Sequence, residues 1–216
     1  MEMYTLFQKY YDLTTFENFT HDLNNKNWVI VIKCVESQQI IGFSTLAFFE
    51  SNVKNKPIGV LYSGDTIIDK KYWGTPELPK NWIKTVLSVG KEYPEPLYWL
   101  LISSGYKTYR FLSVFYKEFY PCYDKATPKD SQSIMNQLAK ERFGEDYYQS
   151  LGIVRFSTGA TPLKAGIADV KPNRLQDEHV KFFLEKNPGH INGDELVCLT
   201  VIHQNNFTPA GKRMAR

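Results

Sequence analysis

Apolar positions in the first seventy residues change from a helical spacing to the pattern of β-strands. Spacings of three and four predict helices over residues 3–10 and 14–23, with Thr14 and Glu17 as a capping box for the second. Runs rich in β-branched and aromatic residues predict strands over 28–35, 40–49 and 58–68. The first of these strands lacks polar alternation, so we expect both of its faces to be buried. Gly64 interrupts the third strand, and a glycine at such a position predicts a β-bulge.

After residue 70 the pattern alternates between helix and strand. Helical spacing and stop signals predict helices over 81–89, 107–119, 127–144 and 177–186. Apolar runs predict further strands over 97–102, 153–156 and 195–203. The crossover through the first of these helices favours a parallel pair between the third and fourth strands. We therefore predict an α/β fold, a mixed and mostly antiparallel sheet of six or seven strands flanked by helices, in a single domain over residues 1–204. The polar, basic residues 205–216 are expected to form a mobile tail.

Composition and charge exclude several classes of protein. Charged residues make up 23% of the 216-residue chain, and 26 Lys and Arg against 23 Asp and Glu give a formal net charge of only +3. This weak, dispersed charge argues against a nucleic-acid partner. The apolar run 28–32 is too short for a membrane span and no signal segment opens the chain, so we expect a cytoplasmic protein. Cys34, Cys122 and Cys198 lie far apart and no CxxC or HExxH spacing occurs, so neither a disulfide framework nor a metal is expected.

Aromatic residues are concentrated in one window of the chain. Eleven of them fall within residues 93–123, which predicts either the densest part of the core or the wall of an apolar cleft. On the predicted helix 107–119, Phe111 belongs to a stripe that faces the sheet, whereas Tyr109 and Tyr116 lie on another side. This second stripe fits a cleft with positioned hydroxyl groups. Tyrosines at the edge of a core, with their tips in water, give the same pattern.

Residues 70–76 form a basic, glycine-containing loop between the bulged strand and a predicted helix. Free backbone N–H groups and the positive end of a helix dipole would face the same point there, which is the arrangement that binds phosphate. A solvated lysine pair, with a glycine that serves only a turn, has the same sequence.

From about Asn27 to Tyr120, this order of elements resembles the GNAT superfamily of acyl-CoA-dependent N-acyltransferases. The segment Ile67-Ile68-Asp69-Lys70-Lys71-Tyr72-Trp73-Gly74 is similar to the family's passage from a strand into its phosphate loop, and Phe115-Tyr116-Lys117-Glu118-Phe119 resembles the end of its last helix. The resemblance implies a GNAT-like fold and an enzyme that moves an acyl group from a thioester to an amine. Pro76 stands where the family has glycine or alanine and has no N–H group, so an acyl-carrier-protein thioester is an expected donor beside acyl-CoA.

The resemblance also implies roles for individual residues. Tyr116 matches the tyrosine that protonates the departing thiolate, and Tyr109 stands near the start of the last helix, where the family has a small polar residue. The donor thioester would be bound by Ile67, Ile68, Lys71, Trp73, Gly74, Thr75 and Tyr109.

The base that deprotonates the amine is suggested by the residues themselves. Asp65, directly after the bulge, is the first candidate, and Glu50 at the end of the second strand is the alternative. Either carboxylate could instead face solvent at a strand end. The bulge would leave a backbone N–H free to bind the thioester oxygen as it becomes negative.

The substrates are bounded more loosely. The expected acceptor is an amine of a small molecule or peptide, and the rings of Tyr98, Trp99, Phe111 and Phe115 suggest room for an acyl chain longer than acetyl unless they fill the core. The main rival is a non-catalytic binding or interaction module on the same fold. A Cys198–His203 pair would suit a hydrolase, but a thiol within an apolar strand is more commonly inert. The oligomeric state stays open, a homodimer included.

Overall fold

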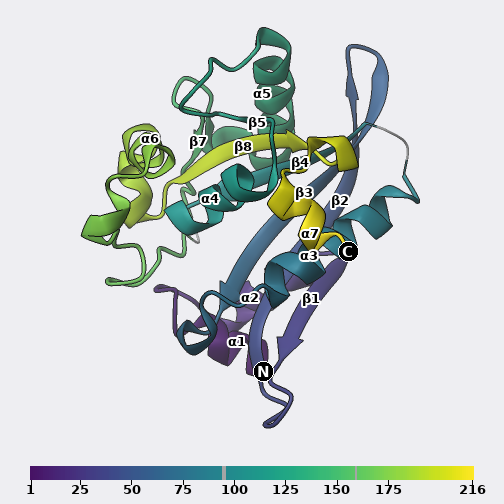
Figure 1. The fold of residues 1–216 in the computed structure, drawn as a ribbon. Coiled ribbons are helices and arrows are strands. Elements are labelled where there is room, and N and C mark those ends of the chain that lie inside the picture. The colour runs from purple at the N-terminus through teal and green to yellow at the C-terminus, as the bar shows by residue number, and fades with distance from the viewer. Residues whose placement is uncertain (94–95, 159) are drawn as a thin grey trace.

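The structure is a computed structural model that describes residues 1–93, 96–158 and 160–216 (Figure 1). Its helices and strands follow the chain as α1 (Glu2–Phe7), α2 (Phe16–Asn24), β1 (Trp28–Lys33), β2 (Ile40–Val53), β3 (Lys56–Ile68), α3 (Glu77–Gly90), β4 (Leu97–Ser103), α4 (Tyr106–Phe115), β5 (Phe119–Tyr120), α5 (Lys129–Phe143), β6 (Tyr147–Tyr148), β7 (Ile153–Val154), α6 (Glu178–Lys186), β8 (Glu195–Val201) and α7 (Pro209–Met214). The N-cap of the second helix lies one residue later than predicted. The hydroxyl of Thr15, rather than that of Thr14, accepts the hydrogen bond from the amide of Asn18.

The strands form one mixed sheet in the order β1-β2-β3-β4-β8-β7-β6, with β5 also paired to β8. The pairing of β3 with β4 is parallel, as predicted, and the other described strand pairs are antiparallel. The prediction of an α/β fold with a mixed, mostly antiparallel sheet flanked by helices is therefore confirmed. The sheet has eight strands instead of six or seven, because two-residue strands such as β5 and β6 are too short to leave a periodic pattern in the sequence.

The first strand differs from its prediction. We expect residues 28–35 to be buried on both faces, but β1 pairs with β2 alone at the edge of the sheet. Its residues alternate, so Ile30 and Ile32 are buried while Val29 and Val31 are exposed. An apolar run without polar alternation is therefore compatible with an edge strand, and here it covers only one layer of the core.

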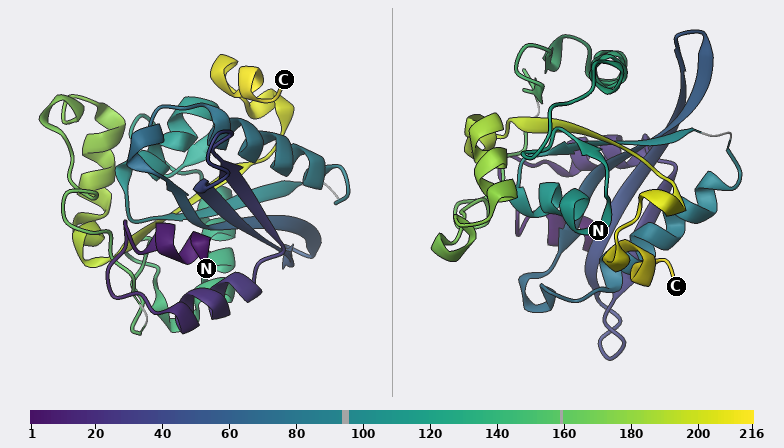
Figure 2. Two further views of the ribbon diagram at one scale, coloured as in Figure 1. Left: turned by 90° about the horizontal axis from the view of Figure 1, so that it is seen from below. Right: turned by 45° about the horizontal axis from the view of Figure 1, so that its top comes forward.

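Two layers of helices cover the two faces of the sheet (Figure 2). Helices α3, α4, α6 and α7 pack on one face against residues such as Leu61 and Leu101. Helix α5 packs on the other face against Tyr62 and Leu100, and α1 and α2 cover the same face further along at Phe43. Neighbouring residues of a strand point to opposite faces, which explains why Leu61 and Tyr62 belong to different layers. Most of the aromatic window is core, in the layer of α3 and α4.

Helix α4 ends at Phe115, one turn earlier than the predicted helix 107–119. Tyr116 has extended backbone angles and forms an isolated antiparallel bridge with Phe207, and the next residues turn into β5. Pairing with segments distant in the sequence therefore overrides the helical spacing. The prediction that Tyr109 and Tyr116 share one face of a single helix is therefore wrong, because Tyr116 lies beyond the end of α4.

The C-terminal residues are packed, which corrects the expectation of a mobile tail at 205–216. Helix α7 lies beside α3 and α4 (Figure 1). The Thr208 hydroxyl caps it by accepting a hydrogen bond from the amide of Gly211, and it donates one to the carbonyl of Val114 at 2.6 Å. A Cβ atom on Gly211 would lie 2.4 Å from the carbonyl oxygen of Phe115, so the close approach of α7 to α4 needs this glycine. The polar, basic composition of residues 205–216 gives no indication of these contacts.

Candidate functional site

A β-bulge separates the regular parts of β2 and β3, where the Ser63-Gly64 interruption predicts it. Ser44 pairs with Thr66 and Leu46 pairs with Ser63, so Gly64 and Asp65 together oppose the single residue Thr45. The parallel pairing of β3 with β4 also ends at Ser63. The two strands therefore separate at the residue where the bulge begins, and this opens a space at the ends of β3 and β4.

Gly64 allows the bulge to be covered closely from α2. An added Cβ atom would lie 2.8 Å from the Thr45 hydroxyl oxygen and 2.7 Å from Cε of Lys26. The Lys26 side chain is only 1% exposed, and its ammonium group lies 2.6 Å from a carboxylate oxygen of Asp22. An ion pair between a buried ammonium group and a half-exposed carboxylate thus covers the bulge, and the ammonium charge is already matched.

A cavity of about 220 Å³ occupies the space where β3 and β4 separate. One wall comes from the covering helices and their connection, with Phe7, Tyr11 and Phe19 as its aromatic side chains. The opposite wall comes from the strands and is polar, with Asp65, Ser103 and Glu195. The helical wall also has polar members, which are Thr14, Thr15, Asn18 and Asp22. Aromatic side chains beside a few convergent polar groups are typical of a small-molecule site.

Asp65 and Glu195 both have strongly raised pKa values. Burial, followed by the nearby charge of Asp22, raises the pKa of Asp65 to about 7, although Lys26 acts in the opposite direction. Burial, followed by the charges of Asp65 and Asp22, raises the pKa of Glu195 to about 8. Near neutral pH the two carboxyl groups therefore hold between them at least one proton, which can be accepted or released where a ligand would lie.

Two tyrosines complete the electrostatic environment of this pair. Burial raises the pKa of Tyr11 and of Tyr62, and the negative charges of Glu195 and Asp65 raise both further. Both phenols are therefore protonated at neutral pH and can donate hydrogen bonds to a ligand.

Of the two predicted bases, the structure places only Asp65 in the cavity. Glu50 is exposed on β2 and pairs with Gly59, five residues beyond Thr45 at the bulge. That separation corresponds to about 17 Å along the strand, and Glu50 does not line the cavity. Glu50 therefore faces solvent, which is the alternative given above for either carboxylate.

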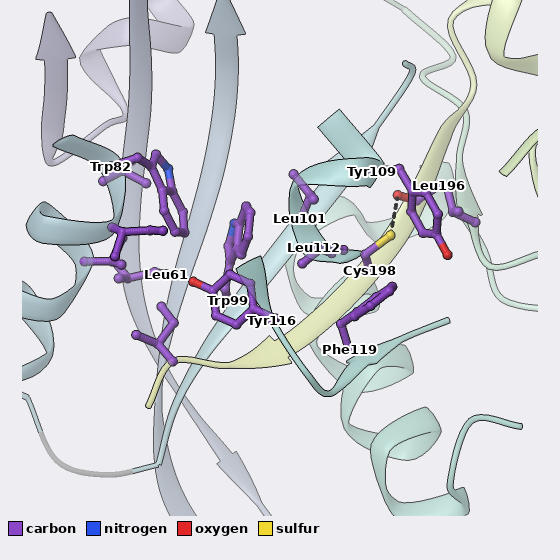
Figure 3. Packing of buried hydrophobic residues seen from close by; sticks show 14 of the residues in the cluster. Leu61, Trp82, Trp99, Leu101, Tyr109, Leu112, Tyr116, Phe119, Leu196 and Cys198 are labelled. Carbon is purple, nitrogen blue, oxygen red and sulfur yellow. Dashed lines mark hydrogen bonds between the residues drawn. The ribbon is translucent and has the colours of Figure 1, made fainter. Parts of the chain in front are cut away.

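The structure does not bring Tyr116 to Asp65. Tyr116 is 1% exposed, and its ring lies beside that of Trp99, with the centroids 5.6 Å apart (Figure 3). The ring of Phe207 also contacts it, with a centroid distance of 5.1 Å. It belongs to the layer of Leu61, whereas the neighbouring Tyr62 lines the cavity on the other face of the sheet. The Tyr116 hydroxyl has no hydrogen-bond partner among the described residues, and burial raises its pKa well above the ordinary value.

Tyr109 also lies in the core instead of in a cleft. Its side chain is fully buried against Phe182 and Phe183 of α6, and its hydroxyl donates a hydrogen bond to the carbonyl of Pro121 at 3.0 Å. Of the rings proposed to make room for an acyl chain, Tyr98 lies in the layer of α5 on the other face of the sheet, and Trp99, Phe111 and Phe115 are packed against one another. Trp99 and Phe111 have centroids 5.5 Å apart, and Phe111 and Phe115 have centroids 4.6 Å apart.

The loop predicted to bind phosphate uses its own backbone donors internally. The amide of Lys71 donates to the Asp69 carboxylate at 3.1 Å, and the amide of Tyr72 donates to the Asp69 carbonyl at 2.8 Å. The amides of Trp73 and Thr75 donate to carbonyls within the same turn at 3.3 and 3.2 Å. Gly74 adopts a φ of +96° with open space around it, so it serves the turn. These contacts leave few N–H groups for a phosphate.

The remaining residues implied for the donor lie outside the cavity. Ile67 is buried against α1, and the carbonyl of Ile68 accepts a hydrogen bond from the Trp73 indole at 2.9 Å. The cavity lining includes none of the loop residues Lys71, Trp73 or Thr75. The bulged strand thus leads to the cavity, whereas the loop after it is a separate, self-contained turn.

Glu195 was missed by the analysis of the sequence. It opens an apolar strand, so the pattern indicates only the start of β8. The available signal was a charged residue placed directly before a run of buried positions. Lys26 was also missed, because a lysine after an amphipathic helix gives no indication that it folds back over a strand.

The chain matches no family model, and comparison with curated proteins gives no matching sequence. In the part of the chain that the structure describes, no three His, Cys, Asp or Glu side chains are grouped so that they could hold a metal ion. No helix among the described residues is both long and apolar enough to cross a membrane. Function is therefore inferred from the geometry and chemistry of the cavity.

Proposed function

We propose that the protein is a GNAT-like N-acyltransferase that moves an acyl group from an acyl-CoA or acyl-carrier-protein thioester to an amine of a small molecule or peptide. Support comes from the order of elements from β1 to α4, the parallel pair β3–β4 and the bulge beside it. These are the features on which the resemblance to that superfamily depends. The acceptor amine would bind in the cavity between the separating strands.

The observation that carries the proposal is the position of Asp65. It is one of the two residues of the bulge, lines the cavity and has a pKa of about 7. An alkyl ammonium has a pKa near 10.4 and must lose a proton before it can attack a thioester. A carboxylate whose pKa is close to the working pH can accept that proton and release it again after each turnover.

The reaction then balances within the cavity. The neutral amine, whose first proton is already on Asp65, forms a bond from its nitrogen to the thioester carbonyl carbon, and the carbon–sulfur bond breaks. The nitrogen then passes its second proton to the carboxylate of Glu195 once Glu195 has protonated the thiolate, and Asp65 releases the first proton to solvent. The departing thiolate needs a proton, and Glu195, protonated at neutral pH because of its raised pKa, can supply it. Tyr62 and Tyr11 are protonated donors that can orient the amine or the developing oxyanion.

The test is to incubate the protein with a series of acyl-CoAs from acetyl to palmitoyl, together with a panel of primary amines, and to follow free thiol. We expect thiol release that needs both substrates and that falls at least 100-fold in Asp65→Asn. Glu50→Gln is the matched control and should keep full activity, since Glu50 lies outside the cavity. Equal activity of Asp65→Asn and the wild type would contradict the proposal.

A non-catalytic module that binds a small amine is the second candidate, and the loop 70–76 favours it. Its amides are engaged within the turn, and Glu77 places a negative charge in the first turn of α3. Both features oppose the binding of a pyrophosphate. This candidate predicts that amines raise the melting temperature while no acyl-CoA does so and no thiol appears.

A further inference from the structure

Residues 187–194, between α6 and β8, contain a buried amide that joins two strands. Asn187 is fully buried, and its side-chain nitrogen donates hydrogen bonds to the carbonyls of Ser103 and Asp194 at 3.3 and 2.8 Å. The regular pairing of β4 with β8 ends at Ser103 and Leu196. The Asn187 side chain therefore continues the hydrogen bonding between these strands past the point where the backbone ladder stops.

The carboxylate of Asp194 is held by Arg155, the residue that follows β7. Asp194 is 4% exposed and accepts hydrogen bonds from Nε and Nη2 of Arg155 at 2.8 and 2.6 Å. This two-point geometry fixes the orientation as well as the position of a carboxylate. A Cβ atom on Gly189 would lie only 2.1 Å from the Asp194 carboxylate, so a residue without a side chain is required there.

The arrangement reaches the cavity wall at three places. Ser103 itself lines the cavity, Asp194 directly precedes Glu195, and Arg155 directly precedes Phe156. The hydrogen bonds thus join the last residue of β4, the residue after β7 and the residue before β8. No member of the arrangement other than Ser103 lines the cavity.

We propose that Asn187 and the Arg155–Asp194 pair are positioning residues that hold the carboxyl group of Glu195 in the cavity opposite Asp65. The proposal rests on the proposed function of that cavity. It gives a role to the segment between α6 and β8, in which Asn187, Gly189 and Asp194 make the close contacts described above. The three residues act on the reaction only through Glu195 and its neighbours.

The charged and titratable groups that face Glu195 come from three parts of the fold. Asp65 lies on β3, Asp22 lies on α2, and Tyr11 and Tyr62 are on the two walls. Burial is the largest cause of the raised pKa of Glu195. If the start of β8 loosens, water reaches Glu195 and its pKa falls toward the ordinary value for a glutamate.

Arg155→Met in the full chain tests the inference, because half of the Arg155 side chain is exposed and its loss disturbs little packing. The charge left unmatched on Asp194 acts to raise the pKa of Glu195, whereas hydration of Glu195 lowers it. We expect hydration to dominate, so that the Glu195 titration, followed by carboxyl carbon NMR, moves at least half a pH unit lower and kcat/KM for thiol release falls about tenfold. Arg155→Lys keeps a single charged donor and should recover part of both losses. The matched control is Lys140→Met, which removes the ion pair to Glu145 at 2.6 Å and should leave the titration unchanged.

Asn187→Ser provides a second, independent variant, since a hydroxyl can replace only one of the two donated hydrogen bonds. It should shift the Glu195 titration in the same direction as Arg155→Met. A lower melting temperature in both variants with an unmoved Glu195 titration would overturn the positioning role. If the wild type releases no thiol from any donor, the proposed function fails, while the NMR titration still decides whether these residues position Glu195.

Discussion

Asp65 and Glu195 line the same cavity from β3 and β8, two strands that are not neighbours in the sheet. The strand between them, β4, ends at Ser103, and Ser103 and Ser104 line the cavity at this end of the strand. Their closeness is seen in the pKa of Glu195, which the charge of Asp65 helps to raise. The placement of the two carboxyl groups thus depends on where the β3–β4 and β4–β8 pairings end and on the bulge in β3.

Replacement of Asp65 by asparagine should separate its chemical role from its effect on stability. Activity should fall at least 100-fold, because the base is lost. The raised pKa means that the folded state holds this proton more tightly than the unfolded state, so ionisation of Asp65 destabilises the fold as pH rises from about 4 to 7. Urea unfolding at pH 4 to 8 should therefore show Asp65→Asn gaining stability relative to the wild type across that range. A gain at low pH instead would contradict the burial of this carboxyl group.

The substitution Asp22→Asn should lower the pKa of both cavity carboxyl groups. It removes a negative charge that raises the pKa of Asp65 and of Glu195, and it frees the ammonium of Lys26, which lowers the pKa of Asp65. Both effects have the same sign. The acidic limb of the pH–rate profile should move to lower pH by about half a unit or more. Asp130→Asn, which breaks an exposed ion pair with Lys54, is the control and should leave the profile in place.

Gly64→Ala should disturb the cavity through the covering ion pair. The new methyl group would push against Lys26 and the Thr45 hydroxyl, which should cost about 1–3 kcal/mol of unfolding free energy and weaken amine binding. Gly74→Ala is the comparison, because its φ of +96° in open space costs about 1–2 kcal/mol through the backbone alone. Calorimetric titration with an amine that binds the wild type should show a weaker affinity for Gly64→Ala and an unchanged one for Gly74→Ala. Equal affinities would place the amine elsewhere.

Tyr116→Phe distinguishes the role implied by the family resemblance from the position that the structure shows. A general acid toward the thiolate predicts lower turnover, whereas a buried hydroxyl without a partner predicts unchanged turnover and equal or higher stability. Because the Tyr116 side chain is buried in the core, we expect unchanged turnover and equal or higher stability. Tyr109→Phe is a useful control, since it removes a hydrogen bond to Pro121 and should cost about 0.5–1.5 kcal/mol. A tenfold loss of thiol release in Tyr116→Phe would restore its assignment as the acid.

Local patterns predicted the frame of this fold better than its ends. The bulge at Gly64, the parallel pair β3–β4 and a strand within residues 195–203 are confirmed because glycine, crossover length and apolar runs act within short stretches of chain. The end of α4 and the packing of α7 depend on contacts such as Tyr116 with Phe207, about ninety positions apart, which no local spacing reveals.

The candidate site shows the same division. Asp65 could be proposed because it adjoins the bulge in sequence. Glu195 and Asp22 reach the cavity through the order of strands and the path of α2, which the sequence pattern does not specify, and Lys26 is paired with Asp22. The pKa of each group is then set by its burial and by charges from other elements, so no single segment contains the information.

The place of β8 in the sheet also has a kinetic consequence. Trp99 pairs with Thr200, so the inner edge of β4 acquires its partner only when a strand from a hundred residues further along arrives. Pairing across so long a separation slows folding, and until it forms, the apolar β4 presents unpaired backbone that can recruit another chain. Refolding yield should therefore fall steeply as protein concentration rises, with aggregation beginning at β4.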